Sequence, residues 1–143
     1  MPTSTIPTLK DHLYDALVAD ASIVAGNIQV SYGFPVNPGR ELVWLHNVAG
    51  EQTWAALGKL RRNETYELTV HIRVERQGAD QQAATERCFV IAGYLENLLR
   101  ADPTVNGAVT WAGFGGPVSL EEFPSSESRE AILTIGVQVQ ARI

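Results

Sequence analysis

A long stretch of alternating apolar and polar residues constrains the fold of this chain more than any other feature. It is YELTVHIRVE, residues 66–75, in which every second residue from Tyr66 to Val74 is apolar. Alternation with a period of two is typical of a β-strand that has one buried and one wet face. Such a strand is about 30 Å long. It contains more residues than the roughly five or six of a typical strand. We therefore expect it to extend beyond the core of its own domain.

The segment after this strand predicts a long helix. The sequence QGAD breaks the strand, and Asp80 can cap the helix by accepting hydrogen bonds from its first amides. The helix is expected to run to about Ala101, where DPTVNG ends it, and to pack across the sheet. Its apolar stripe has helical spacing and consists of Ala84, Cys88, Ile91, Leu95, Leu98 and Leu99.

The two ends of the chain add one helix and one strand. TSTIPTLKDHLYDALVAD, residues 3–20, predicts an amphipathic helix with Thr5 or Thr8 as its cap and Pro7 in its first turn. REAILTIGVQVQARI, residues 129–143, alternates again and predicts a second long, one-sided strand. The expected buried positions are Ile6, Leu9, Leu13, Ala16 and Leu17 in the helix, and Ala131, Leu133, Ile135, Val137, Val139 and Ala141 in the strand.

Shorter elements are predicted between these ends. IQVSYGF (28–34) and ELVWLHNV (41–48) are expected to be strands joined by the turn PVNPG. EQTWAALGKL (51–60) predicts a third strand or, alternatively, a short helix, and RRNE (61–64) predicts a polar turn. AVTWAGF (108–114) predicts a strand, and GGPVSLEEFPSSES a turn, a short strand and a hairpin loop.

The length and charge of the chain limit its possible roles. Its 143 residues predict one domain, residues 1–143, with a substantial core. The net charge of −5 argues against a general nucleic-acid binder, whose footprint is usually basic, but not against a wall that DNA slides past. The start MPTSTIPTLK has no basic segment followed by an apolar run, so we expect no signal peptide. No apolar run approaches the roughly 20 residues of a membrane span, so we expect no membrane contact.

The residues most often used in metal or thiol chemistry are few and scattered. Cys88 is the one cysteine, which excludes an intrachain disulfide and a thiolate zinc site, and we expect it to be buried in the helix. His12, His46 and His71 show no metal-ligand spacing, and we expect structural or solvated roles for them. The sequence therefore predicts no metal and no cofactor.

Other candidate catalytic motifs are equally weak. Glu121 and Glu122 are adjacent, so their side chains would point apart in a strand, whereas an acid/base pair must converge on one substrate. The glycine-rich GFGGP lacks the Gly-Lys-Ser/Thr of a phosphate-binding loop and predicts a hairpin turn. Trp44, Trp54 and Trp111 lie in strand-like stretches without interleaved basic residues, which favours packing in a core or an interface. We therefore expect no enzymatic activity.

Two features indicate contacts with other proteins. Lys59, Arg61 and Arg62 lie close together in an otherwise acidic chain, either as a solvated loop or as a docking contact for an acidic neighbour. The wet faces of the two long strands could contact other copies of the chain. The interface residues predicted on these faces are Arg73, Glu75, Gln138, Gln140 and Arg142.

The order of the elements carries a resemblance. An amphipathic helix precedes several strands, then come the long strand YELTVHIRVERQ, a short polar break and the long helix QQAATERCFVIAGYLENLLRADP. A tryptophan-containing strand and a final alternating strand close the chain. From about Leu9 to Ile143 this pattern resembles the small tail-terminator and tail-completion proteins of long-tailed bacteriophages. The resemblance lies in pattern and length rather than in an invariant motif.

This resemblance implies a fold and a role. The implied fold is α+β, with a mixed, mostly antiparallel sheet covered on one face by the N-terminal helix and the long helix. The implied role is a structural virion protein that forms a hexameric ring on the tail tube, stops its polymerisation and presents the head-joining surface. The implied partners are other copies of the chain, tail-tube protein and head–tail connector proteins, while DNA passes through the lumen without specific binding. The implied location is the neck or tail end of the virion, after assembly in the host cytoplasm.

Two alternative hypotheses belong beside this one. A head-closure protein, a head–tail adaptor or a minor tail protein would act in the same assembly with other neighbours. A small-molecule-binding α+β module, or an enzyme, would need a pocket with converging polar groups. No such group of residues is evident in the sequence.

Overall fold

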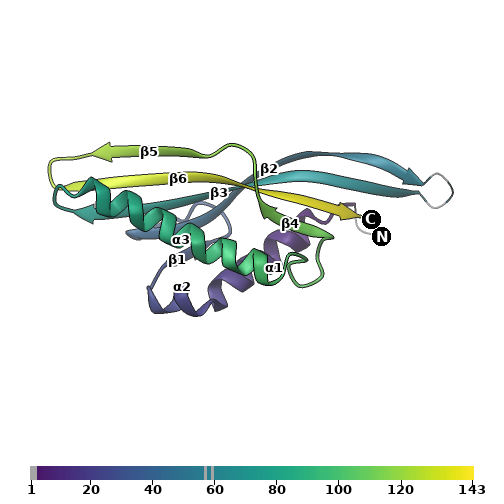
Figure 1. Cartoon of the computed structure of the whole chain (residues 1–143), viewed down its shortest axis with the longest axis horizontal. Helices are drawn as coiled ribbons and strands as arrows, with labels where there is room; N and C mark the ends of the chain where they lie inside the picture. Colours follow the sequence, from purple (N-terminus) through teal and green to yellow (C-terminus); the bar gives the residue numbers. More distant parts are fainter. Residues whose placement is uncertain (1–2, 57, 59) are drawn as a thin grey trace.

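Three long strands run side by side and give the molecule its elongated shape (Figure 1). The computed structural model describes residues 3–56, 58 and 60–143. The long strands are β2 (Glu41–Ala56), β3 (Arg61–Gln77) and β6 (Ser128–Arg142). The other elements are the helices α1 (Ile6–Ala19), α2 (Ala21–Ala25) and α3 (Gln81–Ala101), and the strands β1 (Gln29–Ser31), β4 (Trp111–Phe114) and β5 (Ser119–Pro124).

The strands form one mixed, mostly antiparallel sheet in the order β1-β2-β3-β6-β4, with β5 also pairing β6. Among the described residues, β1 and β2 pair in parallel and the other strand pairs are antiparallel. The helices lie together on one side of the sheet (Figure 1). The expected α+β fold is therefore confirmed.

The core lies between the helices and the alternating faces of β3 and β6. Leu68, Val70, Ile72 and Val74 of β3 have no exposed surface, as the alternation predicts. The alternating positions predicted for β6 are buried too, from Ala131 to Ala141. Helices α1 and α3 cover this face with Leu9, Leu13, Leu17, Ala84, Cys88, Ile91, Leu95 and Leu99.

The long helix α3 begins and ends close to the predicted positions. Asp80 caps it, because its carboxylate accepts a 3.0 Å hydrogen bond from the amide of Ala83. The thiol of Cys88 is fully buried and lies 3.4 Å from the carbonyl oxygen of Ala131. Burial raises the pKa of this thiol to about 11, so it stays protonated at neutral pH.

The prediction for residues 41–64 was wrong in two respects. The two strands expected over 41–48 and 51–60 are one strand, β2, whose pairing with β3 shifts by a bulge between Leu45 and Val48. The polar turn predicted at 61–64 is the start of β3. Polar residues on both faces of a strand resemble a turn in sequence, because the alternation of apolar residues is absent.

Two smaller corrections concern Thr5 and β4. Thr5 occupies the N-cap position of α1, but its hydroxyl makes no capping bond and is used elsewhere. Strand β4 is shorter than the predicted 108–114, because the chain still turns at Ala108 and pairs with β6 only from Trp111.

Candidate assembly surfaces

The end of the hairpin between β2 and β3 forms an arm, namely residues 48–56 of β2 and 61–67 of β3, and its outer part extends beyond the helices (Figure 1). Strand β6 pairs with β3 as far as Asn63, and Ile143 exchanges two backbone hydrogen bonds with Arg62, so only the end of the arm beyond Arg62 consists of two strands. The strands approach closely at Gly50, where an added Cβ would collide with the carbonyl oxygen of Thr65. The predicted overlong strand is thus real, and it extends as one side of a hairpin.

The N-terminal segment is bound to the arm through one buried carboxylate. Glu64 is 2% exposed. Its Oε1 accepts hydrogen bonds from the amide and the hydroxyl of Thr5, at 2.7 and 2.8 Å. Its Oε2 accepts from the hydroxyl of Ser4 at 2.6 Å and from the side-chain amide of Gln52 at 2.7 Å. The Thr5 hydroxyl has donated its one proton to Glu64, so Tyr66 donates to Thr5 Oγ1 at 2.9 Å.

These bonds keep Glu64 ionised in spite of its burial. Burial pushes the pKa of its carboxyl upward, but the hydrogen bonds from Ser4, Thr5 and Gln52 together outweigh it, so the pKa lies below its usual value. Burial raises the pKa of Tyr66 to about 12, which keeps its hydroxyl available as a donor. We conclude that residues 4 and 5 hold the middle of the arm in place through charge-assisted bonds.

The end of the arm combines exposed apolar and basic side chains. Trp54 and Leu60 are 62% and 67% exposed. Arg61 is exposed, whereas Arg62 donates to the side-chain oxygen of Gln52 at 2.8 Å and lies 6.0 Å from the Trp54 ring. The third predicted contact residue of this group, Lys59, lies outside the described residues. The structure therefore places Arg61 and Arg62 in a strand next to a large exposed aromatic residue.

The predicted interface residues in the middle of the sheet lie on its helix-free face and are already bonded within the chain. Arg73 pairs with Glu130 at 2.8 Å and with Glu75 at 2.9 Å, and it also donates to the carbonyl oxygen of Gly39. The hydrogen bond to Glu130, the largest cause, raises the pKa of Arg73 further above its usual value. These contacts give Arg73 and Glu75 a role in the structure of the sheet, and their role in assembly stays a prediction.

The other three predicted residues lie towards the C-terminal end of β6. Gln138 is half-buried and donates to the carboxylate of Glu67 at 2.6 Å. Gln140 and Arg142 are exposed and lie opposite Thr65 and Asn63 of β3. Because opposite residues of paired strands share a face, Gln140 and Arg142 lie on the same face as Arg61, two positions before Asn63. The fold thus brings together three predicted residues that are distant in sequence.

Strand β5 is an apolar and acidic edge that the sequence did not reveal. Val118, Leu120 and Phe123 are 65%, 38% and 43% exposed, and both Glu121 and Glu122 are exposed. The hydroxyl of Thr85 in α3 donates to Glu122 at 2.9 Å, which fixes the helix beside this strand. Phe89, one helical turn beyond Thr85, is 50% exposed. A signal was present, since SLEEFP carries apolar residues on both faces of a short strand.

The helix-free face also contains a cluster of rings. The His71 ring lies 4.7 Å from Trp44 and 5.0 Å from His46, centroid to centroid, although no spacing in the sequence pairs the two histidines. Thr134 Oγ1 is 2.9 Å from His71 Nδ1. Burial lowers the pKa of His71, and the charge of His46 lowers it further, while Glu121 opposes both. The cluster is a packed part of the sheet, so of the two roles expected for His71, structural or solvated, its contacts fit the structural one.

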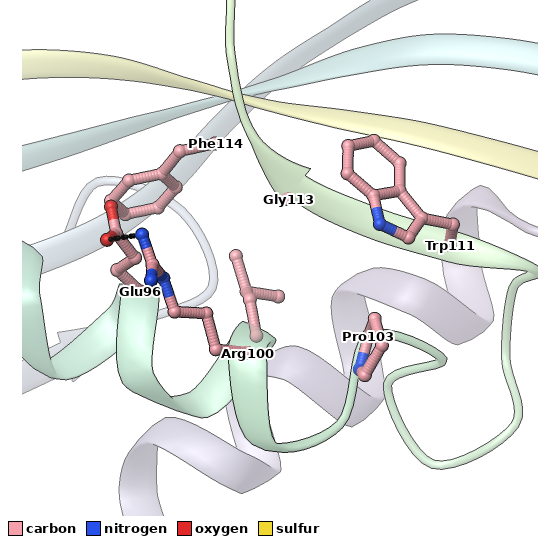
Figure 2. A pocket seen from close by; sticks show the side chains of 7 residues that line it. Glu96, Arg100, Pro103, Trp111, Gly113 and Phe114 are labelled. Atoms are coloured by element: carbon pink, nitrogen blue, oxygen red, sulfur yellow. Dashed lines mark ion pairs between the residues drawn. The ribbon is translucent and has the colours of Figure 1, made fainter.

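An open hollow of about 370 Å³ lies between the end of α3 and β4. Figure 2 shows Glu96 and Arg100 beside Phe114, with Trp111 and Pro103 on the other side. Glu96 and Arg100 neutralise each other in a 2.8 Å ion pair. No group of three potential metal ligands occurs among the described residues. In the described part of the chain, no helix is long and apolar enough to cross a membrane.

Comparisons with known proteins give a similarity in fold. No protein-family model matches the chain, and no curated protein matches its sequence. Among solved structures, a chain from the virion of a native gene transfer agent particle matches with a TM-score of 0.61 and 14% sequence identity. The match covers 98% of this chain and 100% of that chain. This chain therefore has the fold of that virion chain over its whole length.

Proposed function

We propose that this chain is a structural virion protein of the tail-terminator type. In this role it forms a ring, of six copies as the resemblance implies, on the end of a tail tube. The ring stops tube polymerisation and presents the surface that joins the head. DNA passes through its lumen without specific binding, and the chain catalyses no reaction.

The observation that carries this proposal is the full-length fold match to a chain from the virion of a gene transfer agent particle. The order of elements that resembles tail terminators points in the same direction. The exposed arm supports it too, because its end, with Trp54 and Leu60 exposed, offers a surface for another protein. The net charge of −5 suits a lumen that does not retain DNA.

A tube-length experiment tests this role. The tail-tube protein from the same genome is polymerised with and without the chain, and tubes are measured by negative-stain electron microscopy. We expect short tubes, each with extra density at one end, and a ring mass by native mass spectrometry. Tubes of unchanged length and bare ends would contradict the terminator role. Binding to isolated head connectors under those conditions would favour the adaptor role instead.

A further inference from the structure

Two surfaces of the chain lie at opposite ends of the molecule and on opposite edges of its sheet (Figure 1). One is the outer edge of the arm in β2, and the other is the outer edge of β5. Strand β1 pairs with β2 only from Leu42 to Trp44, so among the described residues nothing pairs with the outer edge of 48–56. Likewise β5 pairs only with β6 within the part of the chain that the structure describes.

We propose that the arm of one copy pairs with β5 of the next copy and continues its sheet. This contact deepens the proposed function, on which it rests, by naming the two surfaces that join neighbouring copies in the ring. Unpaired edge strands can add a strand from another chain, with main-chain hydrogen bonds giving the affinity. Because each copy uses two different surfaces, the contact is heterologous and can close into a ring.

Strand direction fits this contact. Strands β2 and β3, β3 and β6, and β6 and β5 are antiparallel pairs, so β5 runs antiparallel to β2. A copy added beside β5 in the same orientation therefore presents its β2 antiparallel to β5. The helix-covered faces of both copies then lie on one side of the joined sheet.

Side chains on the helix side also match. Trp54 pairs with Arg62 and lies on the same face as Gln52 and Glu64, which is the helix side of the sheet. On β5 this side carries Leu120, which lies opposite the buried Leu133 of β6. Leu120 and Phe89 of α3 both lie next to the hydrogen bond between Thr85 and Glu122. Trp54 of the next copy can cover these two exposed apolar side chains.

Charge is complementary between the end of the arm and β5. The end of the arm presents Arg61 and Arg62 in β3, whereas the acidic Glu51 lies further back on β2, and β5 presents Glu121 and Glu122. Arg61 lies on the helix-free side because it is two positions before Asn63, which faces that side in β3. Glu121 lies on the same side because it is opposite Ile132 of β6. In a continuous sheet the two side chains are therefore on one face. Attraction between the two surfaces, and repulsion between like surfaces, favours a head-to-tail arrangement.

A mixing experiment tests the contact. Trp54→Asp damages the arm only, and Leu120→Asp damages the β5 edge only, so each variant retains one working surface. We expect each variant alone to remain monomeric by native mass spectrometry, and an equal mixture to form a dimer and nothing larger. Trp111→Asp, at the exposed tryptophan of β4, is the matched control and is expected to form the same assembly as the wild-type chain.

The outcomes separate this contact from the terminator role. A full ring from Trp54→Asp, with circular dichroism unchanged, would overturn the contact and leave the terminator role standing. A mixture that stays monomeric while the wild type forms rings would also overturn it. A wild-type ring that depends on Trp54 and Leu120 but does not shorten tubes would support the contact and contradict the terminator role. A wild type that remains monomeric with and without tubes would contradict both.

A charge exchange gives a second, independent readout. Arg61→Glu with Arg62→Glu should weaken assembly at least tenfold in the concentration required, and so should Glu121→Arg with Glu122→Arg. A chain that carries all four substitutions restores the opposite charges and should assemble again at near wild-type concentration. Failure of the fourfold variant to regain assembly, when its fold is intact, would count against charge pairing between these surfaces.

Discussion

The middle of the sheet and the arm are parts of the same two strands, yet their inward faces are covered differently. In the middle, Leu68, Val70 and Ile72 of β3 are fully buried beneath the helices. In the arm the same face carries Glu64 and Arg62, and it is covered by residues 3–5 and by Gln52. Apolar packing stabilises the first region, and hydrogen bonds to one carboxylate stabilise the second. The difference shows how a strand can continue past its core without being apolar.

The largest effect should come from a charge in the middle of the sheet. Val70→Asp places a carboxylate without a partner at a position with no exposed surface. We expect the free energy of unfolding to fall by at least about 4 kcal/mol, which is enough to unfold many domains. Urea denaturation followed by circular dichroism measures this. Gln140→Asp, at an exposed position of β6, is the control, and a fully folded Val70→Asp variant would show that the assigned faces are wrong.

The arm should respond to the loss of its carboxylate. Glu64→Ala removes the acceptor shared by Ser4, Thr5 and Gln52, and we expect a loss of about 2–3 kcal/mol. Hydrogen exchange at the Thr5 amide should accelerate, while exchange in the middle of β3 changes less. Glu67→Ala, on the opposite face of the same strand, removes one side-chain hydrogen bond, from Gln138, and should cost less than Glu64→Ala. Equal effects of the two substitutions would remove the special role of Glu64.

Acid should weaken the same bonds. The pKa of Glu64 is lowered in the folded chain, so its contribution is present above the unfolded value of about 4.3 and is lost as pH falls through the lower folded value. The stability difference between the wild type and Glu64→Gln should therefore be constant above about pH 5 and shrink below it. Denaturation at a series of pH values measures it. A difference that stays constant down to about pH 3 would contradict the ionised state.

The sequence predicted the middle of the sheet better than the arm, and the reason is physical. Alternation in 66–75 and 129–141 is a local signal, because neighbouring residues alone show which face of the strand is apolar and therefore buried. Glu64 gives no such signal, since its partners Ser4 and Thr5 are about sixty residues away and become neighbours only in the fold. RRNE therefore resembled a turn. Helix α3 was predicted nearly to the residue, because its cap and its stripe are both local.

Some residues of the candidate surfaces could be predicted from the sequence, and others could not. Gln140 and Arg142 were expected on an outward face and Arg61 in a polar turn, and the structure places all three on one face of the sheet. Arg73 was expected there as well, but its ion pairs with Glu75 and Glu130 depend on the register between β3 and β6, which no short motif encodes. The sequence did not predict that β5 is an exposed edge, because the exposure of Leu120 and Phe123 depends on which strand lies at the edge of the sheet.

The smallest effect on stability should come from the end of the arm. Arg61 is exposed, and the hydrogen bonds of Arg62 to Gln52 and to the carbonyl oxygen of Thr3 are exposed too. Arg61→Glu with Arg62→Glu should therefore change the free energy of unfolding by no more than about 1 kcal/mol. Binding to a tail partner should nevertheless weaken, which electron microscopy measures as the fraction of capped tube ends. Arg76→Glu with Arg100→Glu is the control, because it changes the net charge by the same amount at positions outside the arm. Normal capping by the arm variant would argue against a docking role for the arm. An equal loss of capping in the control would argue against it too.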